Sequence, residues 1–143
     1  MSQLKLMKTA TLPRKTQGEP AGPSTLIEQV RRGLPIAELT ALQSGLQVPL
    51  EQLASKLAIS RATLQRRKAS GKLSPDESDK LLRFSRLLSH ATQVFGDPTK
   101  ARDWLKQPQR GLGGAVPLEY AETEIGAREV ENLLGRIDYG VYA

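Results

Sequence analysis

The stretch that decides the fold is residues 50–68, which read LEQLASKLAISRATLQRRK. Its first part carries apolar residues at three- and four-residue spacing, which predicts a short helix: Leu50, Leu53, Ala54 and Leu57. Ser60 can cap a second helix, and Ile59 and Leu64 would fill the space between the two helices. Ala58 stands at the turn, where glycine is usual. The pattern predicts a helix-turn-helix whose second helix would present its first residues to DNA.

The charge of the second helix also favours DNA binding. Residues 61–72 contain five basic residues and no acidic one. Thr63 and Gln65 lie between the basic residues, and their side chains can contact bases or phosphates. The alternative is an ordinary helical hairpin with a solvated basic face. We predict that the residues in contact with DNA are Ser60, Arg61, Thr63, Gln65, Arg66, Arg67 and Lys68.

Most of the remaining chain also predicts helices, and no segment alternates in the way a strand would. Ser74 and Glu77 can form a capping box around Pro75, which predicts a long helix that ends near Phe95. Further helices are expected over about 24–33, 35–45 and 98–105, after Pro117, and over about 127–138. We therefore expect an all-α protein with three parts: a disordered basic arm over residues 1–23, a helix-turn-helix domain over 24–73, and a C-terminal helical domain over 74–143.

Composition limits the classes of protein that fit the chain. It has no cysteine, which excludes disulfides and cysteine-ligated metal sites. The net charge of +6 and the isoelectric point of about 9.8 favour an anionic partner, nucleic acid first. The first residues lack the apolar run of a signal peptide, and no stretch is apolar for long enough to cross a membrane. We expect a cytoplasmic protein without membrane contact.

The sequence contains no pattern typical of a catalytic or metal site. His90 is the only histidine, and its place in an apolar helical stripe favours a packed or half-exposed structural residue. One histidine and no cysteine exclude a Cys/His dyad and a multi-histidine metal site. The run Gly111-Leu112-Gly113-Gly114 lacks a preceding strand and a following lysine, so a plain turn is favoured over a phosphate loop. We expect no enzyme activity, no cofactor, no metal and no small-molecule substrate.

Several motifs beyond the helix-turn-helix resemble those of the Xre/MbcA/ParS type II antitoxins. They run through most of residues 25–143 and are SRATLQRR (60–67), LSPDESD (73–79), VFGD (94–97), ARDWL (101–105), PQRGLGG (108–114), Pro117-Leu118, Thr123, Gly126-Ala127, Val130, Leu133-Leu134 and RIDYGV (136–141). The chain departs from the family pattern at residues 1–23, at Gln109, where asparagine is more usual, and at Tyr120-Ala121. These departures leave the family resemblance intact and put the specificity for one toxin in doubt.

The resemblance implies an Xre/Cro-like DNA-binding domain, a partner and a mechanism. Such antitoxins pair with a RES-domain toxin that consumes NAD, repress their own operon, and dimerise through the C-terminal helical region. Their last residues reach into the cleft of the toxin and block the substrate. Carried over by position, the toxin-binding residues here are Arg136, Tyr139, Gly140, Val141, Tyr142 and Ala143. The composition alone would favour simple fraying of the last four residues.

Assembly and two competing functions complete the expectations. The apolar residues expected to build the C-terminal bundle and its two-fold contact are Phe95, Trp104, Leu105, Val130, Leu133 and Leu134. A homodimer would suit a palindromic operator. The main alternative function is a stand-alone transcription regulator whose C-terminal domain senses a partner or a ligand. A third is an enzyme, or a protein modified by its toxin, and it lacks the site residues.

Overall fold

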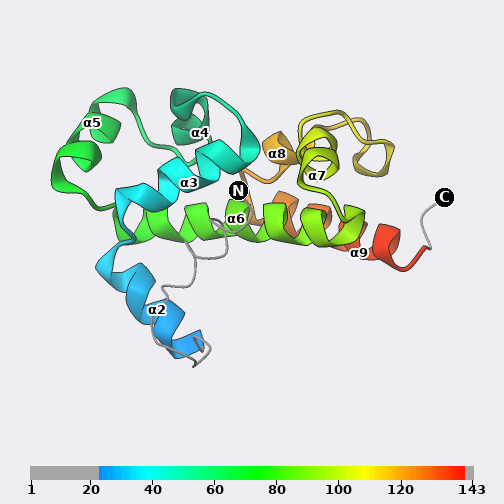
Figure 1. The fold of residues 1–143 in the computed structure, drawn as a ribbon, viewed down its shortest axis with the longest axis horizontal. Coiled ribbons are helices and arrows are strands. Elements are labelled where there is room, and N and C mark those ends of the chain that lie inside the picture. The colour runs from blue at the N-terminus through cyan, green and yellow to red at the C-terminus, as the bar shows by residue number, and fades with distance from the viewer. Residues whose placement is uncertain (1–22, 141–143) are drawn as a thin grey trace. The chain divides into compact units, whose positions relative to one another are not determined.

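The structure, a computed structural model, describes residues 23–140, and the regular elements in that range are all helical (Figure 1). In chain order they are α2 (Pro23–Arg32), α3 (Ile36–Leu46), α4 (Leu50–Lys56), α5 (Arg61–Ser70), α6 (Pro75–Phe95), α7 (Pro98–Leu105), the 3-10 turn η2 (Arg110–Leu112), α8 (Pro117–Tyr120) and α9 (Glu124–Asp138). The all-α prediction is confirmed. The predicted arm lies outside the described residues except for Pro23, which begins α2.

The chain divides into two compact units, and the division falls inside α6, between Leu82 and Arg83. The first unit contains α2 to α5 and the beginning of α6, and the second contains the rest of α6 and the elements after it. The sequence-based boundary between residues 73 and 74 lies just before α6 and stays a prediction. None of the helices described in residues 23–140 is long and apolar enough to cross a membrane.

The core of the first unit is built almost entirely from leucine. The stripe predicted for the helix-turn-helix is buried, and Ile59 and Leu64 fill the space between α4 and α5 with 4 % and 1 % of their surface exposed. The other buried apolar residues of this unit include Leu34, Leu39, Leu42, Leu46, Val48, Leu53, Ala54, Leu57, Leu73, Leu81 and Leu82. Ala58 has a φ of 61°, the left-handed conformation that glycine usually supplies at this turn. The sequence was therefore right that the turn is placed at Ala58.

Two serines fix the beginning of α6. The Ser74 hydroxyl accepts the backbone N–H of Glu77 at 3.1 Å, and Glu77 Oε1 accepts the backbone N–H of Ser74 at 2.9 Å, which confirms the predicted capping box. Ser78 is fully buried; its hydroxyl donates to Ser74 O at 2.8 Å and accepts the backbone N–H of Leu34 at 2.8 Å. The first turn of α6 therefore holds the segment between α2 and α3 as well as its own end.

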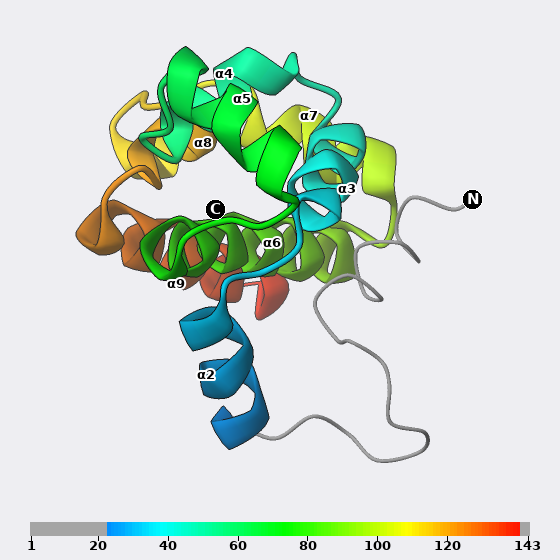
Figure 2. The ribbon, with the colours of Figure 1, turned by 90° about the vertical axis from the view of Figure 1, so that its left-hand side faces the viewer.

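The second unit packs α9 along the later part of α6 (Figures 1 and 2). One stripe of α9 is buried, and two polar contacts tie it to α6: Arg83 reaches Glu122 O at 3.2 Å and Glu124 Oε1 at 3.5 Å, and His90 Nδ1 lies 2.5 Å from Glu131 Oε1. His90 is half-buried, as the sequence analysis expected. The buried stripe of α9 consists of Gly126, Ala127, Val130, Leu133 and Leu134.

This packing corrects the predicted two-fold contact. Leu105, Val130, Leu133 and Leu134 do build the C-terminal bundle, but at most 1 % of each is exposed within a single copy. A side chain that is already covered inside one copy cannot also be covered by a second one. Phe95 and Trp104 are half-buried, with their rings 5.6 Å apart. The contact between copies, if it uses apolar residues, must use others.

The last helix begins earlier than the sequence predicted. Helix α9 starts at Glu124 and not near Ala127, because the Thr123 hydroxyl accepts the backbone N–H of Gly126 at 3.0 Å and caps it there. Gly126 is needed at this first turn, since a Cβ on it would lie 1.7 Å from the carbonyl oxygen of Tyr120. The glycine that weakens the helix signal in the sequence thus lets α9 approach the end of α8.

Gly126 and Gly135 in α9 give a matched pair of substitutions. We expect Gly126→Ala to lower the free energy of unfolding by at least about 1–3 kcal/mol, because the overlap is with backbone and cannot be relieved by a rotamer change. Gly135→Ala should raise it by about 0.5–1 kcal/mol, because its Cβ would meet nothing within 4 Å and alanine favours the helix. Urea unfolding of both variants checks this, and equal effects would contradict the packing described here.

Candidate functional site

Helix α5 presents most of its predicted DNA-contacting residues to solvent. Leu64 is its only buried residue, and it anchors the helix on α4. Thr63 and Arg67 are half-buried. The exposed members of the predicted set are Ser60, Arg61, Gln65, Arg66 and Lys68. The surface of α5 and its cap therefore carries three exposed cations and two neutral polar side chains, which suits phosphate and base contacts.

The first turn of α5 is ordered by its own side chains. The Ser60 hydroxyl accepts the backbone N–H of Thr63 at 3.1 Å, as the sequence predicted for a cap. The Thr63 hydroxyl oxygen in turn accepts from Ser60 Oγ and from Arg66 Nη2, both at 3.0 Å. Arg66 is thus held along the helix and needs to give up only one neutral hydrogen bond to meet a phosphate.

Arg67 differs from the other cations of the predicted set. Its Nε donates to Glu77 Oε1 at 2.8 Å and its Nη2 donates to Glu77 Oε2 at 3.1 Å, so the two side chains form a bidentate pair. Only 27 % of the Arg67 side chain and 12 % of the Glu77 side chain are exposed. The prediction that Arg67 contacts DNA is corrected: this guanidinium is committed to joining α5 to α6, and it positions the helix rather than reading DNA.

The environment of Glu77 keeps its carboxyl group ionised. Burial raises the pKa of Glu77, but the hydrogen bonds from the Arg67 side chain and from the backbone N–H of Ser74 outweigh burial, and the pKa lies below its ordinary value of 4.5. A carboxylate in this place is therefore both a cap for α6 and the counter-ion of α5. This pairing of residues ten positions apart is a functional contact that the sequence pattern did not reveal.

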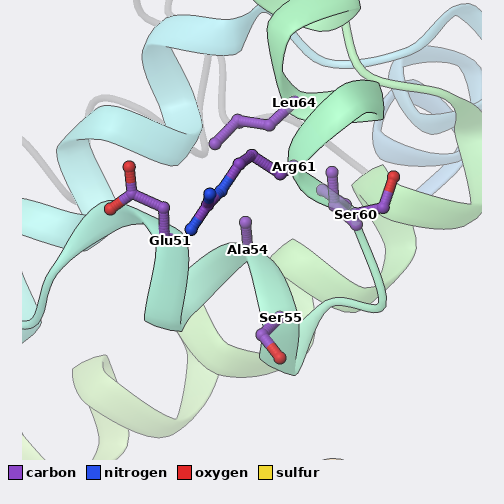
Figure 3. Close-up of a pocket in the computed structure, with 7 residues that line it drawn as sticks. Glu51, Ala54, Ser55, Ser60, Arg61 and Leu64 are labelled. Carbon is purple, nitrogen blue, oxygen red and sulfur yellow. The ribbon is translucent and has the colours of Figure 1, made fainter.

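A pocket of about 210 Å³ lies between α4 and the start of α5 (Figure 3). Its floor is apolar, from Ala54, Ile59 and Leu64, and its rim is polar, from Glu51, Ser55, Ser60 and Arg61. Figure 3 shows the Arg61 side chain extending across the pocket toward Glu51. The sequence analysis named Ser60 and Arg61 but missed Glu51 and Ser55, whose only signal is that they are the polar positions of an otherwise buried helix.

The predicted toxin-binding residues lie at the end of α9. Arg136 and Tyr139 are exposed, and 85 % of the Tyr139 surface is accessible. The backbone N–H of Gly140 donates to Ile137 O at 3.0 Å, and the φ of Gly140 is 72°, so the chain leaves the helix through a left-handed residue. Val141, Tyr142 and Ala143 lie outside the described residues.

The surface of α8 and α9 is acidic and carries isolated apolar side chains. Residues 116–143 contain six acidic and two basic residues, although the whole chain has a net charge of +6. Tyr120 and Ile125 lie among these carboxylates with 40 % and 76 % of their surfaces exposed. The exposed acidic residues of this surface are Glu119, Glu122, Glu124, Glu129 and Asp138. The two units therefore offer surfaces of opposite charge.

Comparison with known protein families identifies both units. Residues 25–86 match the antitoxin Xre-like helix-turn-helix domain, and residues 90–140 match the Xre/MbcA/ParS antitoxin C-terminal toxin-binding domain. The chain belongs to the Xre/MbcA/ParS family of antitoxins. The resemblance stated from the sequence is thereby confirmed, and so is the order of the two domains. As a member of this family the chain is an antitoxin of a toxin–antitoxin system.

Individual relatives agree with this assignment. An Antitoxin Xre of Yersinia enterocolitica is 34 % identical over 139 residues, which cover 95 % of this chain and 93 % of the relative. An Antitoxin Xre of Photorhabdus laumondii is 44 % identical over 82 residues, 57 % of this chain and 55 % of the relative. A protein of Sphingobium named Prs ADP-ribosylating antitoxin is 26 % identical over 133 residues, 86 % of this chain and 84 % of the relative.

The pairing of Glu77 in this antitoxin predicts a pH dependence of stability. Because the pKa of Glu77 is lowered on folding, its contribution is fully present above about pH 4.5 and is lost as the pH falls through the folded pKa. We expect Glu77→Gln to destabilise the protein at neutral pH and the difference from wild type to shrink in acid. Urea unfolding from about pH 7 to about pH 3 checks this.

The control for this prediction is Glu129→Gln, which removes an exposed carboxylate from α9. It should leave the free energy of unfolding nearly unchanged at neutral pH, as is usual for a surface substitution. A difference between wild type and Glu77→Gln that stayed constant with pH would show that the Glu77 carboxylate is not held by Arg67 and Ser74.

Proposed function

We propose that this antitoxin binds operator DNA through α5, represses its own operon, and inhibits a RES-domain toxin by placing residues 140–143 in the NAD-binding cleft of that toxin. The observation that carries the DNA half is the capped, acid-free helix α5, whose exposed face holds Arg61, Arg66 and Lys68. Family membership supports the toxin half, and so does the exposed end of α9. Both activities are binding events in the cytoplasm, and neither assigns a reaction or a cofactor to this chain.

The DNA interface divides into positioning and reading residues. Arg61 and Arg66 stand in the first two turns of α5 and can reach phosphates. Gln65 is exposed, has no side-chain partner among the described residues, and can make a bidentate contact to adenine. Lys68 extends the positive surface toward the end of the helix. Arg67 is excluded from this set by its pair with Glu77.

The double variant Arg61→Ala/Arg66→Ala tests the DNA interface. We expect weaker binding to the promoter region of its own gene and a smaller slope of log affinity against log salt, by about 0.9 for each phosphate that the variant no longer neutralises. A gel-shift titration at several salt concentrations measures both. The matched control is Lys100→Ala/Arg110→Ala, which removes two exposed positive charges from the second unit. If affinity and slope fall equally in both double variants, binding follows net charge and α5 is not the reading element.

Inhibition of the toxin requires a short segment that can leave the helical body. Gly140 provides the turn, and Tyr139 provides an exposed aromatic ring directly before it. The acidic surface of α8 and α9 can supply the larger area that holds the toxin. The name of the Sphingobium relative refers to ADP-ribosylation, a reaction for which NAD is the donor, and this supports an NAD-consuming partner. We propose that the partner is encoded next to this antitoxin and co-purifies with it.

Removal of residues 140–143 separates binding from inhibition. The protein that ends at Tyr139 should keep its fold and its DNA affinity, because Gly140, the described residue among those removed, is exposed. It should bind the toxin only somewhat more weakly, but it should inhibit NAD consumption far less, because an open cleft in a bound toxin still admits NAD. The assay is NAD consumption by purified toxin at saturating antitoxin. Equal inhibition by both forms would overturn the plug and assign inhibition to the helical body.

A further inference from the structure

Helix α2 is an amphipathic helix that its own copy leaves uncovered. Leu26, Ile27 and Val30 form one apolar stripe, yet no described residue of α2 is buried, and 51 % of the Ile27 surface is exposed. In both views α2 extends away from α3 to α5 of the same unit (Figures 1 and 2). An isolated helix of ten residues is marginal in water, so a stripe of this kind needs a partner.

The root of α2 is fixed to the DNA-binding unit. Gly33 ends the helix with a φ of 91°, and a Cβ at this position would lie 2.1 Å from the carbonyl oxygen of Leu73. The next residue, Leu34, donates to the buried Ser78 hydroxyl and accepts the backbone N–H of Leu73 at 2.9 Å. These contacts join the exit of α2 to the turn between α5 and α6. Whatever binds the stripe is therefore held at a set position relative to the DNA-reading helix.

We propose that the partner of α2 is the α2 of a second copy, in an antiparallel pair that joins two helix-turn-helix units on DNA. This inference rests on the proposed DNA binding and adds the contact that pairs the reading heads. It replaces the predicted two-fold contact, since Leu105, Val130, Leu133 and Leu134 are consumed by the core of the second unit. A closed two-fold pair brings the same stripe of each copy together.

The charge of α2 selects the antiparallel arrangement. Arg31 and Arg32 both lie in the last turn, and the first turn has no acidic residue. A parallel pair would bring the arginines of both copies together at one end. An antiparallel pair separates them by most of the helix length, about 15 Å for ten residues, and also opposes the two helix dipoles. Glu28 already pairs with Arg32 of its own copy at 3.2 Å, so the solvent face needs no further partner.

The small area of the contact predicts a dimer that forms mainly on DNA. Three aliphatic side chains on each of two short helices bury much less than the roughly 1,200 Å² of the smallest stable interfaces. The free protein should therefore be largely monomeric at micromolar concentration. Two copies on neighbouring half-sites face each other at an effective concentration on the order of millimolar, at which a weak contact is occupied. The result is cooperative binding to a paired site.

The first test compares Ile27→Asp with two matched variants. Footprinting on the promoter region of its own gene defines the half-sites, and duplexes with one or two half-sites are then titrated. Ile27→Asp should bind one half-site like wild type but lose cooperativity on two, so that the second copy binds about tenfold more weakly. Thr25→Asp adds the same charge to the opposite face of α2, and Ile125→Asp adds it to the exposed apolar residue of α9. Both should behave like wild type.

The outcomes decide between α2 and the other possible contacts. Retained cooperativity in Ile27→Asp would overturn the proposal. Loss of cooperativity in Ile125→Asp instead would place the contact on the C-terminal unit, as the family resemblance implied. Loss in Thr25→Asp as well would mean that charge near DNA, and not the stripe, is responsible, which also overturns the proposal.

A second test needs no DNA and keeps the two proposals separable. The chain has no cysteine, so Ile27→Cys introduces a single thiol. Under mild oxidation at high protein concentration it should form a disulfide-linked dimer several times faster than Ile125→Cys, which is more exposed. Equal rates would overturn pairing through α2. If wild type fails to bind the promoter duplex, the DNA-binding proposal fails, and the rates of disulfide formation alone decide the role of α2.

Discussion

The carboxylate of Glu77 is the constraint on which the DNA-binding unit depends. It accepts two hydrogen bonds from Arg67 near the end of α5 and one from the backbone N–H of Ser74 at the start of α6. A mostly buried carboxylate is costly unless its oxygens are paired, so these contacts stand or fall together. Because α5 is joined to α6 through this group, the exposed face of α5 has one orientation. The neighbouring Ser78 extends the same fixed point to the root of α2.

Local contacts could be predicted from the sequence, and contacts across a turn could not. The Ser60 cap and the box of Ser74 and Glu77 join residues three apart, so the pattern of residues alone defines them. Arg66 and Arg67 look equivalent in the sequence, and only the path of residues 71–73 decides that Arg67 meets Glu77. Thr123 was missed as the cap of α9 because Gly126, three residues later, is typical of a helix end.

Periodicity predicts that a residue is buried, but it does not say by what. The leucines of α9 have the spacing of a buried stripe whether the cover is the same copy or another one. The structure assigns them to their own copy, and the large apolar residues that remain exposed in the described part of the chain are Ile27, Tyr120, Ile125 and Tyr139. These are the residues that would fail to stand out in a search for a core, since each is flanked by polar neighbours. Surfaces for partners therefore had to come from the structure.

The place of the division inside α6 bears on how the two activities interact. Leu81 and Leu82 belong to the core of the first unit, while Phe84, Leu87 and Leu88 belong to that of the second, and all lie on one continuous helix. A helix shared in this way cannot fray in one unit without loss of packing next to the other. Binding of DNA to the first unit and of toxin to the second would both stabilise α6, and such linkage is reciprocal. The opposite charges of the two surfaces keep the partners distinct, while the common helix gives each partner a physical route to influence the binding of the other.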